Sequence, residues 1–103
     1  MMDWRKQARR ALREYPRAKK RNSDNDQPVI EAVEFAMKMQ SEYYNAQERM
    51  RMIRLVYFVR THTLQGAAVD VEYSIETVKK WNLEILTAVY VAMKVKQGNE
   101  PVG

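Results

Sequence analysis

Three features of this chain of 103 residues predict an all-α fold. Apolar residues recur at spacings of about three and four, the period of an amphipathic helix, in residues 3–15, 28–44 and 75–96. Residues that stop or start helices, Pro16 and Pro28, separate the first two segments. The chain is too short for a second core, and its 46% of hydrophobic residues can fill one. We therefore expect one small helical domain.

The amino-terminal segment predicts a short basic amphipathic helix. Its apolar residues recur on one face: Trp4, Ala8, Ala11, Leu12 and Tyr15. Pro16 should end this helix, because proline cannot continue the hydrogen-bonded ladder and disfavours the helical conformation of the residue before it. Residues 17–27 are then polar or charged apart from Ala18, which predicts a flexible linker. The predicted division is a basic helical arm over 1–21, a linker over 22–27, a helical domain over 28–97 and a tail over 98–103.

The middle of the chain predicts two further helices. Pro28 suits the first turn of a helix that should run to about Tyr44, and Asn45 interrupts the pattern. Residues 47–60 leave little polar surface, so this segment is either a buried helix or a strand. Its length, and the arginines spread along it, favour the helix. Those arginines, at positions 49, 51, 54 and 60, either flank a binding groove or solubilise the helix.

Residues 63–81 predict a helix-turn-helix. Thr63 can cap a first helix over Leu64 to Val71, and Ser74 can cap a second helix that starts at Ile75. The inward positions carry the small or apolar residues that two crossing helices require: Ala68, Val78 and Trp81. Gly66 costs up to about 1 kcal/mol inside a helix, so we expect it to permit a close helix approach.

The second helix of this motif should continue to about Lys96, which is longer than groove reading requires. One apolar stripe includes Ile85, Leu86 and Val89, whereas Val91 and Val95 lie partly outside it. Two apolar faces on one helix indicate that one packs inside the domain and the other meets a partner. A second copy of the chain is the simplest partner, so we expect a homodimer.

Charge is concentrated at the amino terminus. Residues 1–21 contain nine basic and two acidic residues, so their net charge is +7. The remainder of the chain is slightly acidic, which brings the total to +5. Such an end favours contact with phosphates, acidic proteins or anionic lipids, or serves only as a solubilising tail. The cations are Arg5, Lys6, Arg9, Arg10, Arg13, Arg17, Lys19, Lys20 and Arg21.

Composition argues against several function classes. Without cysteine and with one histidine, the chain offers neither a thiolate zinc site nor a histidine-built metal site, and we expect no cofactor. No phosphate-binding loop or nucleophile motif indicates an enzyme. No secretory signal precedes the first helix and no run reaches the roughly 20 apolar residues of a membrane span, so we expect a cytoplasmic protein.

The chain resembles phage transcriptional regulators of the ArpU/RinA type. The resemblance rests mainly on residues 51–57, 63–68 and 74–81, and more weakly on residues 12–17. The same carboxy-terminal half is similar, more distantly, to the fourth region of bacterial sigma factors. The resemblance implies a sigma-like DNA-binding domain with a long recognition helix, acting on phage late or packaging genes inside a bacterial host. It also implies double-stranded DNA as the partner.

Carried onto this sequence, the resemblance places one set of side chains on the DNA-facing side of the second helix: Ser74, Glu76, Thr77, Lys79 and Lys80. Weaker candidates come from the basic arm: Arg5, Lys6, Arg9, Arg10, Arg13, Lys19, Lys20 and Arg21. The chain departs from the family pattern at Glu72, where the turn usually has glycine, so we expect a looser or differently shaped turn. Asp70, Glu72 and Glu76 also bring negative charge close to the proposed groove.

Two other functions stay open from the sequence. One is a small-terminase-like subunit that recognises DNA for packaging and assembles into a ring. The other is a sigma-like module that contacts host RNA polymerase without reading bases itself. An ordinary solvated helix face also accounts for Lys79 and Lys80 if neither touches DNA.

Overall fold

A computed structural model describes residues 3–98, and side chains as far as Val95. The described chain is entirely helical between its turns, in the order α1 (Trp4–Arg21), η1 (Asp24–Asp26), α2 (Gln27–Gln40), α3 (Ala46–Ile53), η2 (Arg54–Phe58), α4 (Leu64–Val71) and α5 (Ile75–Gly98). No strand occurs in this part of the chain, so the all-α prediction is confirmed and residues 47–60 are helical. The predicted tail beyond Gly98 lies outside the described residues.

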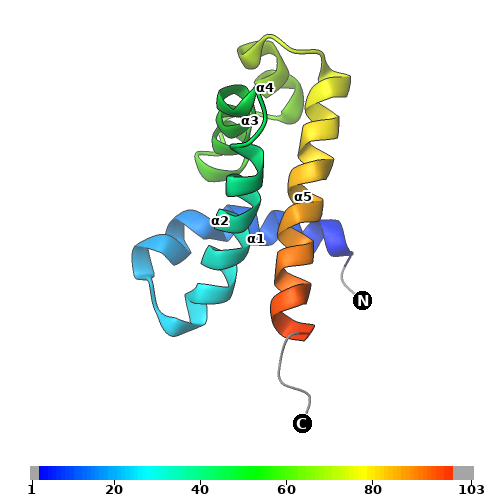
Figure 1. Ribbon diagram of the computed structural model, residues 1–103. Helices are drawn as coiled ribbons and strands as arrows, with labels where there is room; N and C mark the ends of the chain where they lie inside the picture. Colours follow the sequence, from blue (N-terminus) through cyan, green and yellow to red (C-terminus); the bar gives the residue numbers. More distant parts are fainter. Residues whose placement is uncertain (1–2, 99–103) are drawn as a thin grey trace.

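The helices α2 and α5 lie side by side, and α1 crosses behind both of them (Figure 1). The shorter helices α3 and α4 pack at the end where α5 begins. One core holds these elements together, and its largest fully buried side chains include Trp81, Leu12, Met52, Ile53 and Ile85. Because these five come from α1, α3 and α5, the helices share a single interior.

The helix α1 belongs to this core, which corrects the expectation of an appended arm. Leu12 and Ala8 are fully buried, and the Trp4 ring packs at a tilted angle against the Tyr90 ring of α5, with 5.6 Å between centroids. The predicted inward face was right, but its burial partners are α2, η2 and α5 of the same domain. A boundary at residue 21 therefore does not separate an independent unit.

The prediction that Pro16 ends the first helix is wrong. The helix continues to Arg21, and Asn22 closes it in a left-handed conformation, with its backbone N–H donating to the Ala18 carbonyl at 2.7 Å. Packing on both sides of the proline outweighs the single hydrogen bond that proline cannot make. Ala18 beyond it is fully buried, and Lys19 reaches Glu34 on α2 at 2.7 Å.

The predicted flexible linker is an ordered corner between α1 and α2. Asp24–Asp26 forms a short 3₁₀ turn, and Ser23 and Asp26 close it as a capping box. Pro28 lies in the first turn of α2 as expected, whereas α2 ends at Gln40, before Tyr44, which is 94% exposed. The polar composition of the corner reflects its dense hydrogen bonding.

The helix α3 continues into a π-turn that the sequence pattern did not predict. In η2 the backbone N–H of Val59 donates to the carbonyl of Arg54 at 2.9 Å, five residues earlier. The N–H groups of Thr61 and His62 then donate to the carbonyl of Leu55, at 3.0 and 3.3 Å. This reversal leads the chain into α4.

Candidate nucleic-acid interface

The helices α4 and α5 form the predicted pair joined by a tight turn. The Thr63 hydroxyl accepts the backbone N–H of Gly66 at 3.1 Å and caps α4, as predicted. The Ser74 hydroxyl accepts the N–H of Thr77 at 3.2 Å and caps α5, also as predicted. Val78 and Trp81 are buried, and the Trp81 ring lies 4.7 Å from that of Tyr73. Both helix starts are therefore fixed by capping and by packing.

The turn keeps the usual helix-ending geometry although it contains no glycine, which corrects the expectation of a looser turn. Glu72 adopts the left-handed conformation, with φ of 62° and ψ of 40°. Its N–H donates to the Val69 carbonyl at 3.2 Å, and the N–H of Tyr73 donates to the Ala68 carbonyl at 3.1 Å. These are the two bonds of a Schellman motif. The turn thus keeps its usual shape, at a backbone strain at Glu72 of about 1 kcal/mol.

Gly66 does not serve the close helix approach expected of it. A Cβ atom at this position would meet His62 and Thr63 side-chain atoms at 3.5 Å, which is ordinary van der Waals contact. The glycine therefore weakens α4 without a packing reason in this structure.

The first turns of α5 present the predicted DNA-facing residues to solvent. Ser74, Glu76, Lys79 and Lys80 are exposed, and Thr77 is half-buried. The hydroxyls of Ser74 and Thr77 lie 2.9 Å apart and bond each other. Within the described side chains neither lysine forms an ion pair, so both ammonium groups are available to an external anion.

An intramolecular ion pair neutralises part of the negative charge near this face. Asp70 on α4 forms an ion pair with Arg51 on α3. The hydrogen bond from this guanidinium holds the pKa of Asp70 below its usual range. The carboxylates of Glu72 and Glu76 remain exposed beside the lysines. Arg51, one of the arginines predicted to flank a groove or to solubilise α3, thus lowers the repulsion a polyanion would meet here.

A cationic surface lies along α1. An open cleft of about 410 Å³ is lined by Lys6, Arg9, Arg10, Arg13, Glu14, Arg17 and Arg60. Its members on α1 recur at spacings of three and four, so like charges stand one turn apart and repel each other by a few tenths of a kcal/mol per pair. We call these residues the cationic cleft. Arg17 was not among the predicted contacts, whereas Arg60 was one of the arginines expected either to flank a groove or to solubilise residues 47–60.

Arg60 reaches this cleft from a strained backbone conformation. Its φ is 59°, a left-handed value that is uncommon for arginine. The two hydrogen bonds from Thr61 and His62 to the Leu55 carbonyl within η2 hold the chain in this reversal. Sequence spacing could not place Arg60 beside α1, because the π-turn and the left-handed residue together set its direction.

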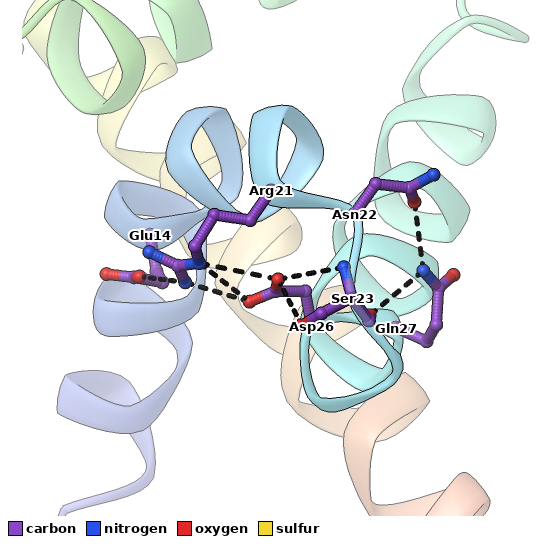
Figure 2. A network of polar contacts seen from close by, with 6 residues as sticks. All are labelled: Glu14, Arg21, Asn22, Ser23, Asp26 and Gln27. Carbon is purple, nitrogen blue, oxygen red and sulfur yellow. Dashed lines mark hydrogen bonds and ion pairs between the residues drawn. The ribbon is translucent and has the colours of Figure 1, made fainter.

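Two other predicted cations of α1 are engaged inside the chain. Arg21 donates to Asp26 and to Glu14, each at 2.8 Å, as Figure 2 shows. These bonds, with those from Ser23, hold the pKa of Asp26 well below its usual range. Lys19 similarly pairs with Glu34 at 2.7 Å. These two cations therefore stabilise the α1–α2 corner, whereas the described structure shows no ion pair for the cations of the cationic cleft.

A buried tyrosine joins the cationic cleft to α5. The Tyr57 hydroxyl donates to the side-chain oxygen of Asn82, which lies one helical turn beyond Lys79. Burial raises the pKa of this phenol, while the positive charges of Arg9 and Arg13 act in the opposite direction. Tyr57 therefore contacts α5 through Asn82 and experiences the positive charge of two α1 arginines.

Arg49 is a buried structural residue that the sequence pattern presented as a surface cation. It is 6% exposed, its guanidinium lies 5.2 Å from the centre of the Trp81 ring, and it donates to Gln40 and Asn45 at 2.8 Å. A weaker ion pair joins it to Glu84 at 3.5 Å. Arg49 thus ties the α2–α3 junction to α5 and fixes the helix that presents the lysines.

Among the described residues, no group of acidic or histidine side chains is placed to hold a metal ion. No helix in the same part of the chain combines the length and apolar character needed to cross a bilayer.

Comparison with protein-family models, with curated proteins and with solved structures finds no match to this chain. The resemblance to ArpU/RinA-type regulators therefore stays a hypothesis.

Proposed function

We propose that this chain binds double-stranded DNA as a helix-turn-helix protein. In this proposal the first turns of α5 enter the major groove and the cationic cleft contacts the phosphate backbone. Lys79 and Lys80 supply contacts in the groove, with Ser74 and Thr77 at its edge. The position of Tyr57 supports the proposal: its hydroxyl bonds Asn82, one turn beyond Lys79 on α5, and the charges of Arg9 and Arg13 on α1 act on the same phenol.

The geometry favours duplex DNA over a general polyanion. A capped helix with exposed polar residues in its first two turns is the form in which a recognition helix reads base edges. Arginines on a separate helix then supply contacts that position the protein without reading sequence. Glu76, exposed in the first turn, can accept a hydrogen bond from a cytosine amino group.

The regulatory role follows from the resemblance alone. We propose, on that basis, transcriptional control of phage genes in a bacterial host, with host RNA polymerase as a further partner. The two rival functions give different results in solution. A ring of subunits would favour the packaging role, and protection of DNA only in the presence of polymerase would favour the sigma-like role.

Titration of fluorescent duplex DNA at several salt concentrations tests the proposal. Each lost phosphate contact should reduce the slope of log affinity against log salt by about 0.9. Arg9→Ala/Arg13→Ala should therefore lower affinity for every duplex and flatten this slope by up to about 1.8. Lys79→Ala/Lys80→Ala should lower affinity and also weaken discrimination among duplexes selected from a random pool.

Lys79→Ala is also measured alone, and Lys94→Ala is its matched control. Lys94 is an exposed lysine on the same helix, where its ammonium lies 5.4 Å from the Tyr90 ring centre. Its removal changes net charge equally but should leave the salt slope close to that of the parent. An unchanged affinity and salt slope in Lys79→Ala/Lys80→Ala would show that these lysines of α5 do not contact DNA. Failure of the parent protein to bind any duplex at low salt would end the proposal.

A further inference from the structure

An apolar groove runs between α2 and the second half of α5. It has a volume of about 480 Å³ and is lined by Pro28, Glu31, Ala32, Phe35, Val91, Ala92 and Val95. Phe35 is 48% exposed, Val91 47% and Val95 58%, although all three lie inside regular helices. Met39, one turn beyond Phe35, is 44% exposed. Large apolar side chains gathered on one face indicate a surface that another molecule covers.

The two helices that form this face run in opposite directions. Near one end the Tyr43 hydroxyl, just beyond α2, donates to Glu84 of α5 at 3.2 Å. Near the other end Pro28, at the start of α2, and Val95, late in α5, line the same groove. The two helices are thus antiparallel (Figure 1). Phe35 and Val91 lie about midway between these two ends of the pair. Two such pairs pack naturally as a four-helix arrangement.

We propose that a second copy of this chain occupies the groove and forms a two-fold symmetric dimer. The two-fold axis would pass close to Phe35, so that α2 packs antiparallel to α2 of the second copy. In a symmetric interface of this kind the same patch is used twice and must be complementary to itself. This inference does not depend on DNA binding.

The charges on α2 meet this requirement. Glu31 and Lys38 are both exposed on the outward side of α2, four residues before and three residues after Phe35. An antiparallel α2 centred just before Phe35, midway between positions 31 and 38, therefore brings Glu31 of one copy opposite Lys38 of the other, and the reverse pair forms by symmetry. Two opposite-charge pairs would thus flank an apolar centre, as in the rim and core of protein interfaces.

The same charges argue against a nucleic acid in the groove. The one charged residue that lines the groove is Glu31, and Lys38 lies exposed on the same helix outside the lining, whereas the cationic cleft has six cations and one carboxylate. No residue that lines the groove also lines that cleft. Self-association through the cleft would be repulsive, whereas the α2–α5 face offers two copies an apolar surface with little net charge.

Sedimentation velocity over a range of concentrations measures the proposed dimer. Phe35→Glu should weaken dimerisation by more than about tenfold, because a carboxylate would be buried at the centre of the interface. Val69→Glu is the matched control, since Val69 on α4 is 76% exposed and lies outside the groove. Circular dichroism of each variant checks that the helices are retained.

Charge reversal tests the register without changing the apolar centre. Glu31→Lys alone and Lys38→Glu alone should each weaken the dimer, because every cross-pair becomes repulsive. An equimolar mixture of these two variants should dimerise again, since each copy then meets its opposite charge. A monomeric parent protein, a closed ring of more than two subunits, an unaffected Phe35→Glu variant or a mixture that stays monomeric would each overturn the proposal.

Discussion

Replacing Leu12 by alanine tests whether α1 is part of the folded domain. Leu12 lies on the inner face of α1 and is fully buried in the core. Its truncation therefore removes apolar contacts and leaves a cavity. Changes of this kind cost about 2–5 kcal/mol of unfolding free energy. With a urea dependence of about 1.5 kcal/mol per molar, a loss of about 3 kcal/mol lowers the midpoint of unfolding by about 2 M. Urea titration followed by circular dichroism measures this shift.

Leu83→Ala provides the matched control for this change. Leu83 is 43% exposed on α5, so the same truncation should cost less than about 1 kcal/mol. If α1 were an appended arm, both variants would unfold at nearly the same urea concentration. That equality, with the parent slope retained, would refute the assignment of α1 to the core.

Three further predictions concern the turns, the helices and pH. Glu72→Gly should raise the free energy of unfolding by about 0.5–1 kcal/mol, since glycine adopts the left-handed conformation without strain, and a lower urea midpoint would contradict this. Gly66→Ala should stabilise α4 by a similar amount of about 0.5–1 kcal/mol, because the added Cβ meets only ordinary contacts, and thermal unfolding measures the gain. The pKa of Asp26 is lowered in the folded state, so its contribution is present above the usual range near pH 4 and is lost as pH falls through the folded value. Asp26→Asn should therefore lower stability at neutral pH and make the acid-induced loss less steep, and identical acid curves for variant and parent would count against it.

Local rules predicted the part of the fold that local interactions determine. Thr63 and Ser74 cap their helices because a hydroxyl at the residue before a helix reaches the backbone N–H three residues on. Val78 and Trp81 are buried because their spacing follows the helical period. These positions needed no knowledge of distant residues.

The same rules failed where distant contacts decide the outcome. Pro16 ends a helix in isolation, but here the residues beyond it are held by α2. Arg49 has the composition of a surface residue, yet aromatic rings and side-chain amides enclose it. The cationic cleft combines Arg60 with α1 across more than forty positions of sequence. None of these arrangements leaves a periodic signal in one sequence.

Because α1 is already packed when the protein is free, any polyanion that it binds meets a preorganised helix. Ordering a disordered basic arm upon binding would bury new apolar surface and give a large negative heat capacity change. The buried inner face of α1 has no such surface left to bury. Calorimetric titration with duplex DNA at several temperatures should therefore give a small heat capacity change, with affinity governed mainly by counterion release.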